Sequence, residues 1–244
     1  MIRNLVFTGV VVFTFSLAGG QAPQVSTASP VLVELFTSEG CSSCPPADVL
    51  LTRLDREQPV PSAHIIVLSE HIDYWNHDGW VDPYSSAALT ARQESYVRRF
   101  GIDGPYTPEM VVDGRAQFNG SDARAAITAI LDAASQPKAM VRITRQGDEA
   151  QIEAEALPSG RIRKANLYVA WAEESGASDV LRGENKGRRL EYVAIARDLK
   201  QIGTVNTNSG FQAKVPLKTG LRLIVFLQQP DTGVVLGSAV LPAA

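Results

Sequence analysis

The chain has 244 residues, of which 45% are hydrophobic and 20% are charged. Those fractions are typical of a folded globular protein and exclude a disordered or collagen-like chain. The 23 lysines and arginines against 26 aspartates and glutamates give a formal net charge of −3. This argues against a nucleic-acid-binding protein, which would usually carry a basic surface. Only two cysteines are present, which excludes a disulfide-dense scaffold and a four-cysteine zinc site.

The first segment has the layout of a secretory signal peptide. Arg3 precedes an uncharged apolar run at 5–17, and small residues at 18–20 follow it. The run is short for a membrane span, and we expect no span in the mature chain. We therefore predict a signal peptide at 1–20, a linker at 21–30 and a periplasmic or secreted protein, with an uncleaved N-terminal anchor as the alternative. In an oxidising compartment a nearby pair of cysteines can persist as a disulfide.

The first part of the mature chain alternates between strand and helix signals. We predict strands at 31–37 and 65–68, with a helix between them whose apolar residues recur at helical spacing. A second helix is predicted at 85–100. Asp113-Gly114 then separates two short apolar runs, which is typical of a β-hairpin, and an amphipathic helix follows. The predicted order is β-α-β-α-β-β-α.

After residue 136 the sequence contains strand signals only. Turn-forming residues separate short apolar runs, a pattern that favours a small β-sandwich. We therefore predict an α/β domain at 31–136 followed by an all-β, sandwich-like domain at 137–244. The candidate strands of the second domain are 139–145, 151–156, 166–172, 190–197, 211–216, 221–228 and 233–240.

Cys41 and Cys44 lie between the first predicted strand and the first predicted helix, separated by two serines. This spacing lets the sulfurs bridge, and unpaired N–H groups at a helix N-terminus stabilise a thiolate. We therefore predict an exposed nucleophile, Cys41, and a more buried resolving thiol, Cys44, in a thiol–disulfide oxidoreductase. Two alternatives stay open. One is a structural disulfide in a non-catalytic binding protein, and the other is a copper or zinc carrier that uses both thiolates and a loop histidine.

With the cysteine pair, the element order and Thr107-Pro108 in place, residues 31–134 resemble a thioredoxin-like fold. In that superfamily a cis proline precedes the third strand and packs beside the cysteine pair, and Pro108 matches that position. The resemblance implies that the backbone of Thr107 pairs with a bound substrate strand; a plain trans turn is the alternative. One departure concerns Glu34, the only acid within the first predicted strand. It lies seven residues before Cys41, so strand alternation turns it to the opposite face from the expected buried acid.

Longer runs are similar to the secreted, thioredoxin-like proteins of the domain of unknown function 1223 family. The resemblance covers almost the whole mature chain and implies an exported thioredoxin-like protein, but it names no substrate. The runs are VELFTSEGCSSCPPAD at 33–48, HIDYWNHDGWVDPYS at 71–85, TARQ at 90–93, YTPEMVVDG at 106–114 and RGENKGRRLEYV at 182–193.

The loop at 71–84 is rich in aromatic and ionisable side chains. We predict that Trp75 contributes to a substrate-binding wall over the cysteine pair, and that His71 or Asp73 shuttles protons near it. The alternative is that the aromatic rings cap the sheet and the polar groups satisfy loop backbone. The basic, glycine-containing run at 182–189 is predicted as a mobile surface loop between strands, with anion binding as the alternative.

The expected partners are a protein or small molecule that carries thiols or a disulfide, and a redox partner. We expect no nucleic acid, no cofactor and no bound metal.

Overall fold

The computed structural model describes residues 28–77, 79–160 and 162–243. The signal peptide predicted at 1–20 lies outside the described residues. In chain order the elements are β1 Ser29–Thr37, α1 Pro45–Glu57, β2 Ala63–His71, α2 Ala87–Phe100, β3 Glu109–Val112, β4 Ala116–Asn119, α3 Ala123–Ser135, β5 Val141–Gln146, β6 Glu149–Ala154, β7 Lys164–Asp179, β8 Arg189–Asn206, β9 Phe211–Pro216, β10 Leu221–Gln228 and β11 Val235–Leu241.

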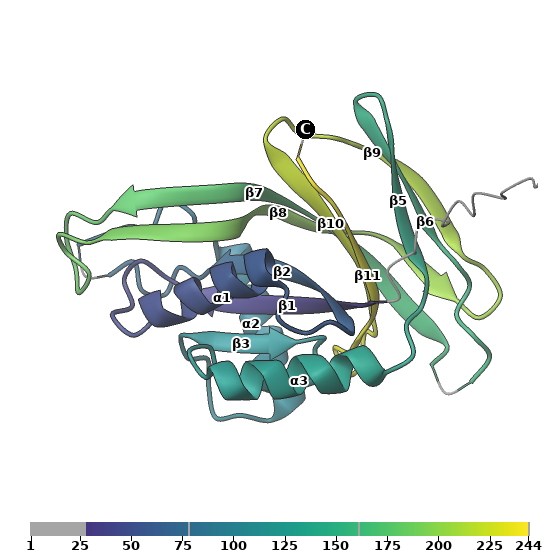
Figure 1. Cartoon of the computed structure of the whole chain (residues 1–244), viewed down its shortest axis with the longest axis horizontal. Coiled ribbons are helices and arrows are strands. Elements are labelled where there is room, and N and C mark those ends of the chain that lie inside the picture. Colours follow the sequence, from purple (N-terminus) through teal and green to yellow (C-terminus); the bar gives the residue numbers. More distant parts are fainter. Residues whose placement is uncertain (1–27, 78, 161, 244) are drawn as a thin grey trace, which may run out of the picture.

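Two sheets organise these strands. The larger is a mixed sheet of eight strands in the order β11-β10-β7-β8-β2-β1-β3-β4, and the smaller contains β5, β6 and β9. β1 and β2 are parallel and in register from Ser29↔Ala63 to Thr37↔His71, whereas β1 and β3 are antiparallel. The carboxyl ends of β1 and β2 therefore meet at one edge of the sheet, next to the start of α1 (Figure 1).

The predicted fold class, an α/β thioredoxin-like domain followed by a β-sandwich, is wrong. β7, β8, β10 and β11 come from the second half of the chain, yet they continue the sheet that contains β1 and β2. β8 joins β2 in parallel at Ser69↔Ile195, so it covers backbone groups that would otherwise lie at an open edge. The described residues thus form a mostly β structure with three helices, built on one large mixed sheet and one small sheet.

Local chemistry explains where the helices begin and end. α1 begins with two prolines, which are tolerated in a first turn because its N–H groups have no intrahelical partner. α2 is capped by Ser86, whose side chain accepts a hydrogen bond from the Leu89 backbone, and it ends at Gly101 with φ of 65°. α3 is capped by Asp122, whose carboxylate accepts two backbone N–H groups of the first turn.

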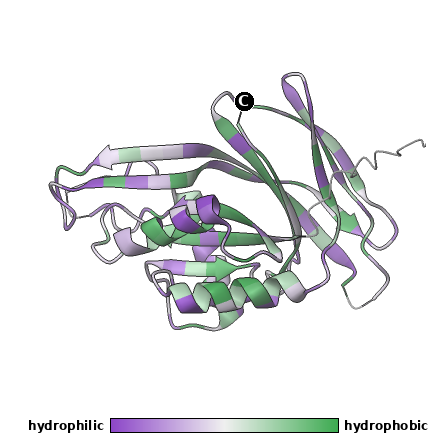
Figure 2. Ribbon diagram, viewed as in Figure 1, coloured by the Kyte–Doolittle hydropathy of each residue, from purple (hydrophilic) through white to green (hydrophobic). Residues whose placement is uncertain are grey.

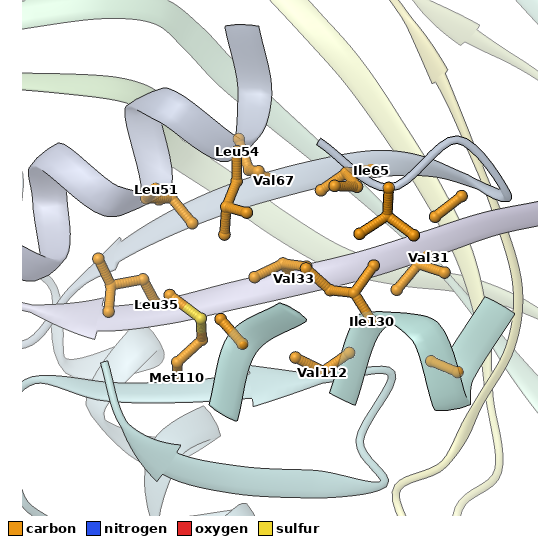
Figure 3. Close-up of a cluster of buried hydrophobic side chains, with 14 of the residues drawn as sticks. Val31, Val33, Leu35, Leu51, Leu54, Ile65, Val67, Met110, Val112 and Ile130 are labelled. Atoms are coloured by element: carbon orange, nitrogen blue, oxygen red, sulfur yellow. The ribbon is translucent and has the colours of Figure 1, made fainter. Parts of the chain in front are cut away.

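Alternate residues of β1 pack into different cores. Val33 and Leu35 face α1 and α3, as Figure 3 shows, in a cluster that includes Leu51, Leu54 and Ile130. The intervening residues face α2. Among them Glu34 turns to that side, as the alternation predicts, and its carboxylate accepts hydrogen bonds from Tyr96 Oη at 2.6 Å and Arg92 Nε at 2.6 Å.

Candidate functional site

The cysteine pair lies in the turn between β1 and α1, where the sequence predicts it. Cys41 and Cys44 form a disulfide with a Cα–Cα distance of 5.4 Å. The Cys41 N–H donates to the Ser38 carbonyl at 3.2 Å, and Cys44 is the residue immediately before α1. The two sulfurs are therefore held at the N-terminal end of a helix, where a thiolate would be stabilised.

The expected exposure of Cys41 is not found. Both cysteines have an exposed fraction of 0%, although Ser42 and Ser43 between them are exposed. The segment between β7 and β8 contacts the backbone of their turn. Asn185 Nδ2 donates to the carbonyl oxygens of Glu39 and Cys41, both at 2.9 Å, and the Ser42 N–H donates to Glu184 Oε2 at 3.1 Å. The predicted surface loop at 182–189 is therefore part of the site.

Thr107, Pro108 and Trp75 come together beside the cysteine pair. The Thr107-Pro108 peptide bond is cis. Ser43 Oγ donates to the Thr107 carbonyl at 3.4 Å and lies 3.3 Å from Cys41 Sγ, and Trp75 Nε1 donates to Thr107 Oγ1 at 2.7 Å. Three segments that are distant in sequence thus meet at one place, with the Thr107 backbone facing the turn that carries the cysteines.

His71 and Asp73, which we predicted as alternative proton carriers, lie in different environments. His71 is fully buried at the end of β2, and its Nδ1 lies 2.7 Å from Asp82 Oδ2. Asp73 accepts a hydrogen bond from Thr90 Oγ1 at 2.6 Å, and its backbone N–H donates to the same oxygen. These contacts tie Asp73 to the first turn of α2, whereas His71 belongs to a buried group of ionisable side chains.

This group, here called the ionisable cluster, consists of Glu39, Asp48, His71 and Asp82. Sequence patterns did not predict its three acids as site residues. Thr37 Oγ1 donates to Asp48 Oδ1 at 2.8 Å, and the Glu39 N–H donates to Asp82 Oδ2 at 2.9 Å. A usable sequence signal existed for Asp48, because it follows Cys44 by one helical turn on the face of α1 that is otherwise apolar and buried.

Burial controls the protonation of the cluster. It raises the pKa of Asp48 to about 7, against the smaller opposing effects of the His71 charge and the Thr37 hydrogen bond. Burial alone would lower the pKa of His71, but the nearby Asp82 carboxylate raises it overall. Burial alone would raise the pKa of Asp82, but the charge and hydrogen bond of His71, together with the backbone N–H groups of Glu39 and Tyr84, lower it overall. We therefore assign His71 and Asp82 as an ion pair beside a carboxyl that exchanges its proton near neutral pH.

Unpartnered atoms also gather in this cluster. Within the described residues, Glu39 Oε1, His71 Nε2 and Tyr192 Oη are buried and have no hydrogen-bond partner, although Trp80 Nε1 donates to the other Glu39 oxygen at 2.6 Å. Over the same ranges, no group of three or more His, Cys, Asp or Glu side chains is arranged to hold a metal ion. No helix in the described part of the chain is long and apolar enough to cross a membrane.

Fold and site together define a mixed-sheet protein with a disulfide of the C-x-x-C type, buried at a strand–helix junction above ionisable side chains. Residues 32–228 match the family described as "Protein of unknown function (DUF1223)", and the chain belongs to this family. The family resemblance noted from the sequence is thus confirmed, whereas membership of the thioredoxin superfamily stays a prediction.

Two solved structures resemble the chain. The X-ray crystal structure of protein AGR_C_4864 from Agrobacterium tumefaciens is 29% identical, with a TM-score of 0.74, over 89% of this chain and 96% of that chain. HBP35 of Porphyromonas gingivalis is 13% identical, with a TM-score of 0.57, over 89% of this chain and 76% of that chain, and shows a similarity of fold alone. No protein of curated function matches the chain.

Proposed function

We propose that this protein is an exported thiol–disulfide oxidoreductase that acts through Cys41 and Cys44. The proposal rests on one observation, which is that three features meet around the disulfide. They are the α1 N-terminus, the Thr107 backbone and the ionisable cluster. A strand, a C-x-x-C turn, a helix and an adjacent Thr-Pro segment also form the local arrangement expected of the thioredoxin superfamily. The signal-like segment at 1–20 supports export to an oxidising compartment.

The chemistry begins from the oxidised protein and a dithiol substrate. A substrate thiolate attacks Cys41 Sγ and breaks its bond to Cys44 Sγ, so Cys44 leaves as a thiolate and a mixed disulfide forms. The second substrate thiolate attacks the substrate sulfur of that mixed disulfide and releases Cys41 as a thiolate. The substrate loses two electrons and becomes a disulfide, while the protein disulfide becomes a dithiol. In the opposite direction, the reduced protein converts a substrate disulfide into a dithiol.

Neighbouring groups support both thiolates. The N–H groups at the start of α1 stabilise negative charge on Cys41. Glu39 opposes that charge only when it is ionised, and burial raises its pKa. Asp48 lies one helical turn beyond Cys44, and its pKa of about 7 suits a group that gives and takes a proton as Cys44 leaves and returns.

Trapping of mixed disulfides tests the proposal. In a Cys44→Ser variant the resolving thiol is missing, so Cys41 should stay covalently attached to its substrates. The exported fraction of cells that produce this variant should contain adducts that disappear on treatment with dithiothreitol. Cys41→Ser, which keeps the other thiol, is the matched control and should give none. Absence of adducts from Cys44→Ser in the exported fraction would refute the proposed activity.

Complete burial of both cysteines favours a second candidate, a non-catalytic binding protein with a structural disulfide at the strand–helix junction. Structural disulfides of exported proteins have reduction potentials below about −300 mV, whereas catalytic pairs are poised higher. Equilibration of the protein in dithiothreitol buffers of known potential, followed by alkylation of free thiols, separates the two. A potential below that limit, together with an absence of trapped adducts, would establish the structural role.

A further inference from the structure

Residues 180–188, here called the hairpin tip, join β7 to β8 and contact the backbone of the turn that carries the cysteine pair. We propose that the hairpin tip is a displaceable cover, and that thiol–disulfide exchange at Cys41 requires it to lift away from the disulfide. The closed protein is then a latent form with few molecules open at any moment. This inference rests on the proposed oxidoreductase function and adds the control of access to the same site.

The hairpin tip is carried by a two-stranded ribbon that extends beyond the large sheet. β10 pairs with β7 as far as Glu173, and β2 pairs with β8 at Ile195. Beyond these points the two strands pair with each other, from Ser175↔Val193 to Asp179↔Arg189. Figure 1 shows this ribbon reaching over α1, and Figure 2 shows hydrophilic and hydrophobic residues mixed along it. A two-stranded ribbon is only marginally stable without further packing.

The underside of the ribbon is not packed continuously against the helix below it. A groove opens between them, with Val49 and Arg53 of α1 on one side and Ala177 and Glu191 of the ribbon on the other. Val49 is 59% exposed. The ribbon is therefore held at its base by the sheet, along β8 by the buried side chains of Leu190 and Tyr192, and at its end by contacts near the disulfide. Movement is then confined to the hairpin tip.

The contacts at the end of the arm are specific and few. Asn185 is fully buried, and both of its amide hydrogens are used on the carbonyl oxygens of Glu39 and Cys41. Its Oδ1 accepts a hydrogen bond from Arg188 Nη1 at 2.8 Å. Close by, Val180 belongs to an apolar cluster that includes Trp80 and Tyr84. These interactions favour the closed form, and Asn185 holds the covering segment directly to the cysteine turn.

The hairpin tip is also internally bonded, so it can move as one body. Its two ends are joined by hydrogen bonds from the Val180 N–H to the Arg188 carbonyl at 2.9 Å and from the Gly187 N–H to the Val180 carbonyl at 2.7 Å. When it lifts, the Cys41 carbonyl and the Ser42 N–H lose their partners in the hairpin tip. Both groups then become available to the backbone of an incoming substrate next to Cys41.

The test measures access to the disulfide with tris(2-carboxyethyl)phosphine, a reductant that needs no enzymatic activity from the protein. Reduction is followed in the folded, oxidised protein by maleimide labelling of the new thiols. In Asn185→Ala the carbonyl groups of Glu39 and Cys41 lose the amide donor of residue 185 only in the closed form, so reduction should be about tenfold faster than in the wild type. Asn208→Ala, an exposed asparagine in the turn between β8 and β9, is the matched control and should react at the wild-type rate.

A second variant removes the cover altogether. Replacement of 180–188 by Asn-Gly joins the paired residues Asp179 and Arg189 through a two-residue hairpin turn. This variant should be reduced at least as fast as Asn185→Ala. If Asn185→Ala fails to fold, it still tests whether the hairpin tip limits access to the disulfide. Reduction of the trimmed protein within twofold of the wild-type rate would overturn the proposal.

The same two variants separate this inference from the proposed function. If both variants are reduced faster but no adducts are trapped in the Cys44→Ser background, the hairpin tip is supported as a cover and the oxidoreductase function is refuted. Adducts that form equally well with and without the hairpin tip, together with unchanged reduction rates, would support the oxidoreductase and refute the cover.

Discussion

The substitution Asp48→Asn tests the raised pKa of the buried carboxyl group that lies one helical turn after Cys44. Asparagine has nearly the same shape and keeps an oxygen that can accept the 2.8 Å hydrogen bond from Thr37 Oγ1. The substitution therefore removes the ionisation of residue 48 and changes little else. Its effect on stability should depend on pH in a way that follows from the pKa of Asp48.

The sign and size of the effect follow from linkage. The pKa of Asp48 is about 7 in the folded protein, against 3.8 for an ordinary aspartate. Between these values the folded state holds the proton more tightly than the unfolded state, so wild-type stability falls as the pH rises. At pH 8 the folded protein bears the full cost of a buried carboxylate, about 4 kcal/mol at 1.36 kcal/mol per pKa unit. Asp48→Asn should be close to wild type at pH 4 and more stable by up to that amount at pH 8.

Urea unfolding of the oxidised protein at pH 4, 6 and 8 measures the difference. Titrating groups outside the ionisable cluster contribute equally to both proteins and cancel when the variant is compared with the wild type. Asp132→Asn, at an exposed position of α3, is the matched control and should show no such trend. A stability difference for Asp48→Asn that stays constant from pH 4 to 8, or that shrinks as the pH rises, would refute the assignment of a raised pKa.

Three further predictions concern packing and charge. Gly114→Ala should destabilise the fold by about 3 kcal/mol or more in thermal unfolding, because φ is +59° and a Cβ there would overlap a backbone carbonyl of a neighbouring turn. Gly147→Ala has a similar φ of +62° but open space, so it should cost only about 1–2 kcal/mol; equal losses would contradict the packing argument. Arg92→Leu removes the guanidinium that contacts the buried carboxyl groups of Glu34 and Glu70 and should cost about 3–5 kcal/mol in urea unfolding, and a neutral result would contradict this role. Asp82→Asn should lower the pKa of His71 in an NMR titration, because burial then acts against fewer negative charges, and an unchanged pKa would contradict the ion pair.

Local signals in the sequence were sufficient for much of the first half of the chain. Two prolines and an apolar stripe predict α1, and Asp113-Gly114 predicts the turn between β3 and β4. The position of Cys41 and Cys44 between a strand and a helix follows from the same signals. Each depends on residues within a few positions of one another, so the pattern is readable without knowledge of distant contacts.

Local signals were not sufficient for the second half of the chain. The runs predicted as strands at 166–172 and 190–197 are parts of the much longer β7 and β8. The outer part of β7, after residue 172, carries no apolar pattern, so the sequence predicts no strand there and a mobile surface loop at 182–189. β2 and β8 are far apart in the sequence, so local signals did not reveal that they pair. This led to the prediction of a separate β-sandwich.

For this protein the sequence alone determined which residues carry sulfur chemistry and which local element holds them. Tertiary structure alone decided that Asn185, from the far end of a long hairpin, bonds to the cysteine turn, and that Asp48 and His71 share one buried cluster. The physical reason is that exposure and pKa depend on every group packed around an atom. In this fold the decisive groups come from strands and loops that are distant from one another in the sequence.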